Sequence, residues 1–176
     1  VNMTVGQGFV ETNPLQMAIA YSAIANGGKI VTPVVAQEVT DQSGRVVRKI
    51  SSARPARDLG IPARILTPVR EGLKLAATGS QGTAYGVFAP VMQSGGPQIA
   101  GKTGTAESGI KGQPDHAWFV GYAPADNPKI VVAVVVEHGG TGATNAAPAV
   151  CHTIAAYGPT RFDPNLCGVP IQKESN

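Results

Sequence analysis

Two stretches of the chain combine a helical spacing of apolar residues with a proline-marked start. The first opens at Thr12-Asn13-Pro14, where a polar side chain can cap the helix, and it stops at Asn26-Gly27-Gly28. The second opens at Thr67-Pro68 and runs to Thr78, before Gly79. We expect small and apolar residues on the inward faces: Leu15, Ala18, Ile19, Ser22 and Ala23 in the first helix, and Val69, Leu73, Ala76 and Ala77 in the second.

Three later stretches, 99–107, 116–123 and 129–137, have the composition of β-strands. Their faces are largely apolar, which predicts a sheet that is covered on both sides. The short, proline-bounded segment 124–128 joins the last two strands, so they should pair as antiparallel neighbours. The glycine-rich stretch 79–96 should be a long, irregular connection that leads into the first strand.

The remaining segments are typical of surface structure. Residues 29–47 predict an exposed hairpin, and 51–62 a loop. The basic residues between Arg45 and Arg64 lack interleaved aromatic residues, so we interpret them as solvated and expect no nucleic-acid partner. A last helix should open near Asn145 and end at Gly158, and 158–176 should form a surface tail.

Composition narrows the class of protein. Of 176 residues, 43% are hydrophobic and 14% charged, which suits one globular domain and excludes a disordered chain or a coiled coil. No apolar run approaches the roughly 20 residues of a membrane span. The first residue is Val1 and not Met, so we expect a processed, clipped or excised piece whose anchor or export signal would lie upstream.

The cysteines and histidines leave one question open. Cys151 and Cys167 could form a disulfide, which would imply an oxidising compartment, or remain two free thiols. No two histidines have the spacing of a helical ligand pair, and neither cysteine has the spacing of a metal site. We therefore expect neither a metal nor another cofactor.

The octapeptide Ala100–Glu107 contains the candidate functional residues. It combines Lys102 with two threonine hydroxyls and two glycines at the start of the apolar strands. Alternation on a strand places Lys102 and Gly104 on one face and the threonines on the other, but a twist or bulge at Gly104 could bring the ammonium and a hydroxyl to one anion. The group suits a peptide carboxylate, because an edge strand also offers backbone N–H and C=O groups. The alternative is an ordinary exposed strand with one lysine.

Several motifs in order resemble the transpeptidase domain of class B penicillin-binding proteins, with the elongation-type enzymes most similar. Residues 102–105 match the Lys-Thr-Gly signature of the active-site serine enzymes that recognise penicillin. The resemblance covers roughly residues 5–157. The other matching stretches are Gly6-Gln7-Gly8, Asn13-Pro14-Leu15-Gln16, the run 20–28, Gly82-Thr83-Ala84, the run 115–124 and Ala146-Ala147-Pro148.

This resemblance implies an α/β (α+β) fold with a mainly antiparallel sheet between helical layers. It also implies a peptidoglycan D,D-transpeptidase, in which a serine attacks the D-Ala-D-Ala bond of a stem peptide and β-lactams acylate the same serine. By resemblance, Lys102 supports proton transfer and the anionic ligand, while Thr103 and Thr105 bind the substrate carboxylate. The backbone N–H of Thr105 would belong to the oxyanion hole, and Gly104 would keep the channel clear.

The resemblance further implies a place on the outer face of the bacterial cytoplasmic membrane. A membrane glycosyltransferase of the cell-wall machinery would be a partner there. The alternatives are a serine β-lactamase or β-lactam sensor, and a non-catalytic scaffold of the same fold. The segments 115–124 and 20–28 favour the transpeptidase over the β-lactamase.

One departure from the family pattern is decisive. No Ser-x-Asn occurs, and the one Ser-x-x-Lys string, Ser108–Lys111, falls after the Lys-Thr-Gly strand in a glycine-rich loop, where its two side chains would not share a helix face. We therefore interpret residues 1–176 as the C-terminal portion of a transpeptidase domain. Its partner would be the N-terminal part that carries Ser-x-x-Lys and Ser-x-Asn. His116 and Trp118 are expected to pack in or beside the sheet.

Overall fold

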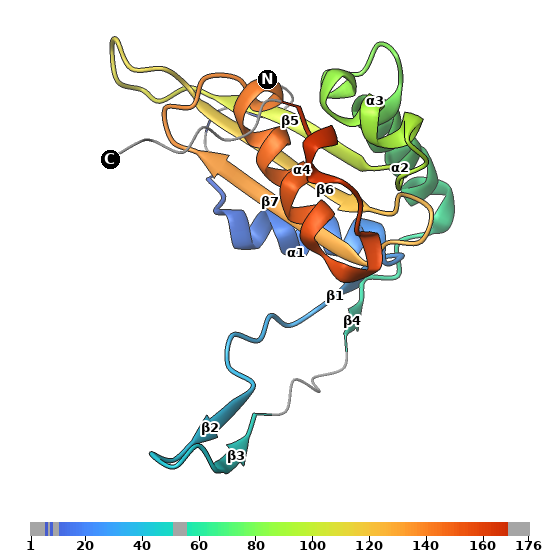
Figure 1. Cartoon of the computed structure of the whole chain (residues 1–176). Helices are drawn as coiled ribbons and strands as arrows, with labels where there is room; N and C mark the ends of the chain where they lie inside the picture. Colours follow the sequence, from blue (N-terminus) through green and yellow to red (C-terminus); the bar gives the residue numbers. More distant parts are fainter. Residues whose placement is uncertain (1–5, 7, 9–10, 51–55, 169–176) are drawn as a thin grey trace.

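The computed structural model describes residues 6, 8, 11–50 and 56–168, and a three-stranded antiparallel sheet lies at its centre (Figure 1). The strands are β5 (Ala100–Ala106), β6 (His116–Ala123) and β7 (Ile130–Val136), in the order β5-β6-β7. Their bounds lie within one residue of the predicted ones. The register is unbroken, with Lys102 opposite Val120 and Gly104 opposite Trp118.

Helices pack on both faces of this sheet, as predicted. One core cluster joins α1 (Pro14–Ala25) and α2 (Ala63–Thr78) to the face of Tyr122 and Val131. A larger cluster joins α3 (Tyr85–Gln93) and α4 (Ala147–Ala156) to the opposite face, which carries Phe119. A π-helical turn, η2 (Gly142–Ala146), leads into α4.

The start of α1 agrees with its sequence signals. Asn13 is the cap: its side chain accepts the N–H of Gln16 at 2.9 Å, and the Gln16 side chain accepts the N–H of Asn13 at 3.0 Å. The buried face agrees with the prediction at Ala23, which is buried, and differs at Leu15, which is exposed, and at Ala25, which is buried but was not predicted. Small residues there allow the helix to approach the sheet closely.

Two helix predictions were wrong. The helix α2 begins at Ala63, four residues before the predicted start, and Pro68 lies inside it. Burial of Leu66 against the region of Gly28 and Ile61 accounts for the extra turn, because tertiary packing outweighs the backbone hydrogen bond that proline cannot make. The predicted inward residue Val69 is exposed.

The connection 79–96 was also predicted wrongly as irregular. It contains α3, whose Phe88, Ala89 and Val91 are buried. The helical spacing of these three apolar residues was missed because the segment also contains several glycines and Pro90, which usually break helices. Burial in the larger core cluster stabilises the helix despite that composition.

Residues 29–50 and 56–58 form an arm whose outer part extends away from the sheet and helices in Figure 1, while its base at Lys29–Ile30 adjoins α1. Its base pairs β1 (Lys29–Ile30) with β4 (Arg57–Asp58), and its outer part pairs β2 (Glu38–Thr40) with β3 (Val46–Lys49). The hairpin prediction is therefore confirmed. Residues 51–55, within the predicted loop 51–62, lie outside the described part.

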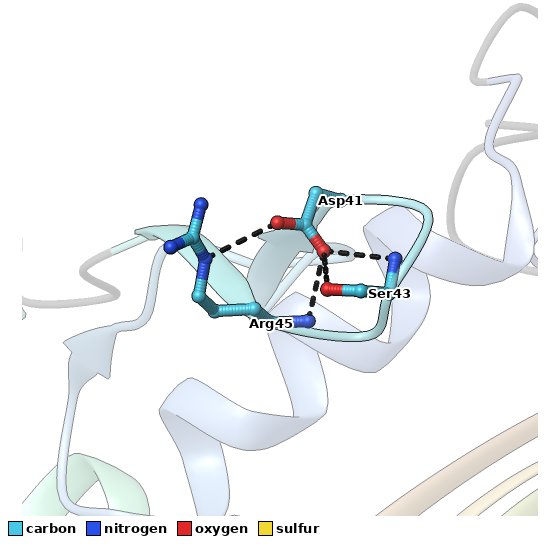
Figure 2. Close-up of polar contacts among 3 residues, drawn as sticks. All are labelled: Asp41, Ser43 and Arg45. Carbon is cyan, nitrogen blue, oxygen red and sulfur yellow. Dashed lines mark hydrogen bonds and ion pairs between the residues drawn. The ribbon is translucent and has the colours of Figure 1, made fainter.

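The turn at the tip of the arm is organised by one carboxylate (Figure 2). Asp41 accepts the hydroxyl of Ser43 at 2.6 Å and the backbone N–H groups of Ser43 and Arg45 at 2.9 and 3.0 Å. The Arg45 guanidinium lies 3.2 Å from its other oxygen. The Ser43 hydroxyl, followed by the backbone of Arg45, lowers the pKa of Asp41.

After α4 the chain forms two short 3₁₀ helices, η3 (Gly158–Thr160) and η4 (Pro164–Leu166). Cys151 and Cys167 form a disulfide with a Cα–Cα distance of 5.4 Å, and both are buried. The open question about these cysteines is thereby settled. Within the described ranges, none of the helices has the length and apolar character needed to cross a bilayer.

Candidate active-site cleft

A cleft of about 620 Å³ runs along the Lys-Thr-Gly strand, between that strand and the N-terminal part of the chain. All four predicted binding residues, 102–105, line it. The structure therefore brings together the residues that the sequence analysis singled out. The remaining lining residues are Gly6, Gly8, Glu11, Thr12, Met17, Tyr21, Ala106, Glu107, His116, Trp118 and Val120.

Lys102 and Thr103 meet although their side chains start on opposite faces of β5. The Lys102 ammonium donates to the Thr103 carbonyl oxygen at 2.9 Å and lies 3.2 Å from the Thr103 hydroxyl. No bulge is needed, because the β5–β6 register is continuous and the long lysine side chain bends around the strand. The Lys102 ammonium and the Thr103 hydroxyl therefore lie side by side on β5.

A third polar group, Thr83, extends this pair. The hydroxyls of Thr83 and Thr103 lie 2.8 Å apart, so Thr83 is joined to Lys102 through one intermediate side chain. Thr83 was recognised only as part of a family motif, and twenty residues separate it from Thr103. The structure places it where it can orient the Thr103 hydroxyl toward a ligand.

Gly104 lies opposite Trp118, and its face of the strand is directed at the cleft. A Cβ added to Gly104 would lie 3.1 Å from the Cβ of Trp118. Any larger residue would press on the indole and fill the space beside the lysine.

His116 and Trp118 lie in the sheet, in strand β6, and both also line the cleft. The Nδ1 atom of His116 accepts the backbone N–H of His138 at 3.1 Å, and the two imidazole rings are 4.8 Å apart. This bond reserves Nδ1 as an acceptor, so neutral His116 carries its proton on Nε2. Within the described ranges, no three histidine, cysteine or acidic side chains form a group that could hold a metal ion.

The lining of the cleft also includes a half-buried phenol, that of Tyr21. Burial, followed by the nearby Tyr122, raises the pKa of Tyr21, which lines the cleft. Burial also raises the pKa of Tyr122. Both tyrosines therefore remain neutral hydroxyls under all ordinary conditions, and Tyr21 can offer a hydrogen bond but no charge.

The cleft lacks a nucleophile of its own among the described lining residues, since no serine or cysteine is found there. Ser108 and Lys111 lie in the loop between β5 and β6, as predicted. The Ser108 hydroxyl is within 3.5 Å of the carbonyl oxygens of Ile110 and Gln113, and it shares no helix face with Lys111.

An antiparallel sheet between helical layers, with Lys-Thr-Gly on the strand beside a cleft, defines the class of penicillin-recognising domains. Residues 2–156 match the family described as the penicillin-binding protein transpeptidase domain. The chain belongs to this family. The resemblance to class B enzymes, with the elongation type most similar, is confirmed.

Curated relatives align with most or all of the chain. It is 30% identical to peptidoglycan D,D-transpeptidase MrdA of Haemophilus influenzae, over 100% of this chain and 28% of that protein. It is 36% identical to peptidoglycan D,D-transpeptidase PbpA of Mycolicibacterium smegmatis, over 87% of this chain and 30% of that protein. The chain therefore spans less than a third of the length of these relatives.

Solved structures show the same fold. Penicillin-binding protein A of Mycobacterium tuberculosis, as a ceftriaxone acyl-enzyme, matches with a TM-score of 0.68 and 30% identity, over 84% of this chain and 32% of that one. PBP2 of Pseudomonas aeruginosa in complex with WCK 5153 matches with a TM-score of 0.67 and 30% identity, over 93% of this chain and 35% of that one. The predicted fold class is confirmed.

Proposed function

We propose that this chain supplies the Lys-Thr-Gly wall of a peptidoglycan D,D-transpeptidase that forms a serine acyl-enzyme. The observation that carries the proposal is the contact of Lys102, Thr103 and Thr83 beside an open cleft in a domain of this family. The two relatives described above are named peptidoglycan D,D-transpeptidases. The M. tuberculosis protein is an acyl-enzyme with a β-lactam.

In the proposed reaction, the terminal carboxylate of a stem peptide binds at Lys102, Thr103 and Thr105. The serine oxygen, supplied by the remainder of the domain, attacks the carbonyl carbon of the D-Ala-D-Ala bond. The backbone N–H of Thr105 stabilises the oxyanion, an interaction worth about 3–4 kcal/mol in other acyl-transfer enzymes. The terminal D-Ala leaves, and an amine of a second stem peptide takes the acyl group and frees the serine.

The proposed partner is the N-terminal part of the same domain, with Ser-x-x-Lys and Ser-x-Asn. Its place beside the cleft would put the serine opposite residues 102–105. The PBP2 of Helicobacter pylori has been solved in complex with MreC, which shows that a relative of this fold binds a further protein. A membrane glycosyltransferase and the outer face of the cytoplasmic membrane remain our proposals, and the Cys151–Cys167 disulfide favours an oxidising compartment.

Fluorescent penicillin tests the proposal on the full-length protein that contains this chain. We expect a covalent label that survives denaturing electrophoresis and is lost slowly. The variant Lys102→Met should be labelled at least tenfold more slowly, because the ligand carboxylate loses its cation. The matched control Lys111→Met, in the loop after β5, should be labelled like wild type.

Other outcomes point to the alternatives. Rapid loss of the label with release of hydrolysed penicillin would indicate a β-lactamase. No label at all would indicate a non-catalytic scaffold. Slow labelling of Lys111→Met together with normal labelling of Lys102→Met would place the active lysine in the loop and overturn the proposed site.

A further inference from the structure

The π-helical turn η2 packs on the side of the Lys-Thr-Gly strand that faces away from the cleft. Gly142 is buried at its start. A Cβ added to Gly142 would overlap the carbonyl oxygen of Trp118 and lie 2.6 Å from the carbonyl oxygen and 3.0 Å from the nitrogen of Gly104. Real Cβ atoms do not approach backbone atoms this closely. Residue 142 must therefore be glycine because there is no room for a side chain, and not because of its φ angle.

This contact falls on the pair of residues in the middle of the site. Gly104 and Trp118 are opposite each other in the β5–β6 register. Lys102 and Thr105 lie on either side of Gly104 along the strand. The backbone of Gly142 therefore supports the strand directly behind the residues that would hold the ligand carboxylate and the oxyanion.

The segment around Gly142 is itself fixed by contacts that do not involve β5. The His138 N–H donates to His116 Nδ1, and His138 Nδ1 donates to the Pro114 carbonyl oxygen, both at 3.1 Å. The Gly140 N–H donates to the Asp115 carbonyl oxygen at 2.8 Å. These bonds tie residues 138–140 to the start of β6.

Hydrogen bonds inside the segment complete its support. The Asn145 side chain donates to the Gly139 carbonyl oxygen at 2.5 Å, and the hydroxyls of Thr141 and Thr144 lie 2.9 Å apart. A turn that is cross-linked within itself and tied to β6 can hold a fixed position. Since β5 is at the edge of the described sheet, a fixed surface behind it limits its movement out of the plane.

We infer that Gly142 is a positioning residue for acyl transfer. Its close packing fixes the distance between η2 and the backbone of β5 at Gly104, and thereby the positions of Lys102 and the Thr105 N–H. This inference rests on the proposed function. Misplacement of catalytic groups by about 1 Å can cost roughly 100-fold in rate. A methyl group at residue 142 would impose a displacement of this order.

The test compares two glycine variants in the full-length protein. Gly142→Ala should lower the rate constant of labelling by saturating fluorescent penicillin by roughly 100-fold, while the final stoichiometry of labelling stays at the wild-type level. The matched control is Gly86→Ala, because a Cβ at Gly86 in α3 meets nothing within 4 Å. It should label within twofold of the wild-type rate.

A second variant, Asn145→Ala, tests the same inference if Gly142→Ala does not fold. Asn145→Ala removes the bond to the Gly139 carbonyl oxygen without adding an atom, so the turn loosens but is not overpacked. We expect slower labelling, by about threefold to tenfold, again with full final stoichiometry. Reduced stoichiometry at an unchanged rate, in either variant, would show loss of folded protein only and would overturn the inference.

Hydrogen exchange separates the inference from the proposed function. In Gly142→Ala, the amides of residues 102–105 should exchange at least tenfold faster than in Gly86→Ala, while those of β7 should not change. If wild type is not labelled but this exchange pattern is found, the proposed function fails and the support of β5 by Gly142 stands. If exchange at residues 102–105 is unchanged, the inference is wrong whatever the labelling shows.

Discussion

The Thr103 hydroxyl stands between a cation and another hydroxyl, and this position determines what it can offer a ligand. Lys102 donates to it and Thr83 shares a bond with it, so its orientation is set from two sides. A hydroxyl held in this way is ready to donate to a carboxylate without the cost of being ordered on binding.

Replacing Thr103 tests this arrangement. Thr103→Val keeps the shape of the side chain and removes the oxygen, and Thr103→Ser keeps the oxygen. Loss of a hydrogen bond to a charged ligand costs about 1.5–3 kcal/mol, so Thr103→Val should acylate about tenfold to a hundredfold more slowly. Thr103→Ser should stay within a few-fold of wild type. Equal rates for the two variants would show that the oxygen has no such role.

Asp41 gives a prediction about pH. Its pKa is lowered from the ordinary 3.8, first by the Ser43 hydroxyl and then by the Arg45 N–H. A lowered folded-state pKa means that the turn is stabilised above the ordinary value and loses this contribution as pH falls through the folded value. Amide chemical shifts of Ser43 and Arg45 should therefore titrate with a midpoint below 3.8. Asp41→Asn should abolish the transition, and a midpoint above 3.8 would contradict the prediction.

The site could be predicted from sequence only where its residues are neighbours along the chain. Lys102 to Thr105 form one strand segment, and a local motif identified them. The contact between Thr83 and Thr103 and the His116–His138 pair depend on segments twenty or more residues apart. A local sequence pattern does not predict these contacts, because the first is made by the segment before α3 and the second by the segment after β7, beside the start of β6.

At the scale of elements, α3 shows how burial can override composition. Phe88 is fully buried, and its ring lies 5.3 Å from that of Phe119. Phe88→Ala should lower the free energy of unfolding of the transpeptidase domain by about 3–5 kcal/mol, measured by urea denaturation of the full-length protein. The control Leu75→Ala, at a position that is 63% exposed, should change it by no more than about 0.5 kcal/mol. Equal losses for both variants would refute the assignment of α3 to the core.

The elements that sequence predicted well are those with strong local signals. The strands β5 to β7 and the capped start of α1 lie within a residue of expectation. The early start of α2 and the whole of α3 were missed because Pro68, Gly86 and Pro90 are ordinarily helix breakers. Contacts with distant segments determine these two helices.

At the scale of the whole molecule, the disulfide ties the end of the described chain to α4. It closes a loop of 16 residues, for which the chain-entropy model gives about 3 kcal/mol of stabilisation. The double variant Cys151→Ala/Cys167→Ala should lose about this amount in urea denaturation. Reduction by dithiothreitol should lower wild-type stability similarly and leave the double variant unaffected. A stability unchanged by reduction would contradict the prediction.

We expect this chain to need a partner in order to fold well, and two surfaces motivate that expectation. All residues of β7 are only half-buried, and no described strand pairs with its outer edge. An apolar hollow of about 410 Å³ opens beside α1, with Ile19, Ile24 and Leu66 in its lining. We expect the chain alone to lack a cooperative thermal transition by circular dichroism, and to gain one with the N-terminal part of the domain. A stable monomer by size-exclusion chromatography, with cooperative unfolding, would contradict this.

The outer hairpin of the arm, β2 and β3, has a practical consequence. Because β2 and β3 lie away from the cleft and the turn at Asp41 closes on itself, a peptide inserted beside Gln42 would touch neither the sheet nor the site. An epitope or a small fluorescent protein placed there would label the protein in living cells while leaving both termini unaltered. The hairpin thus offers a labelling position for microscopy.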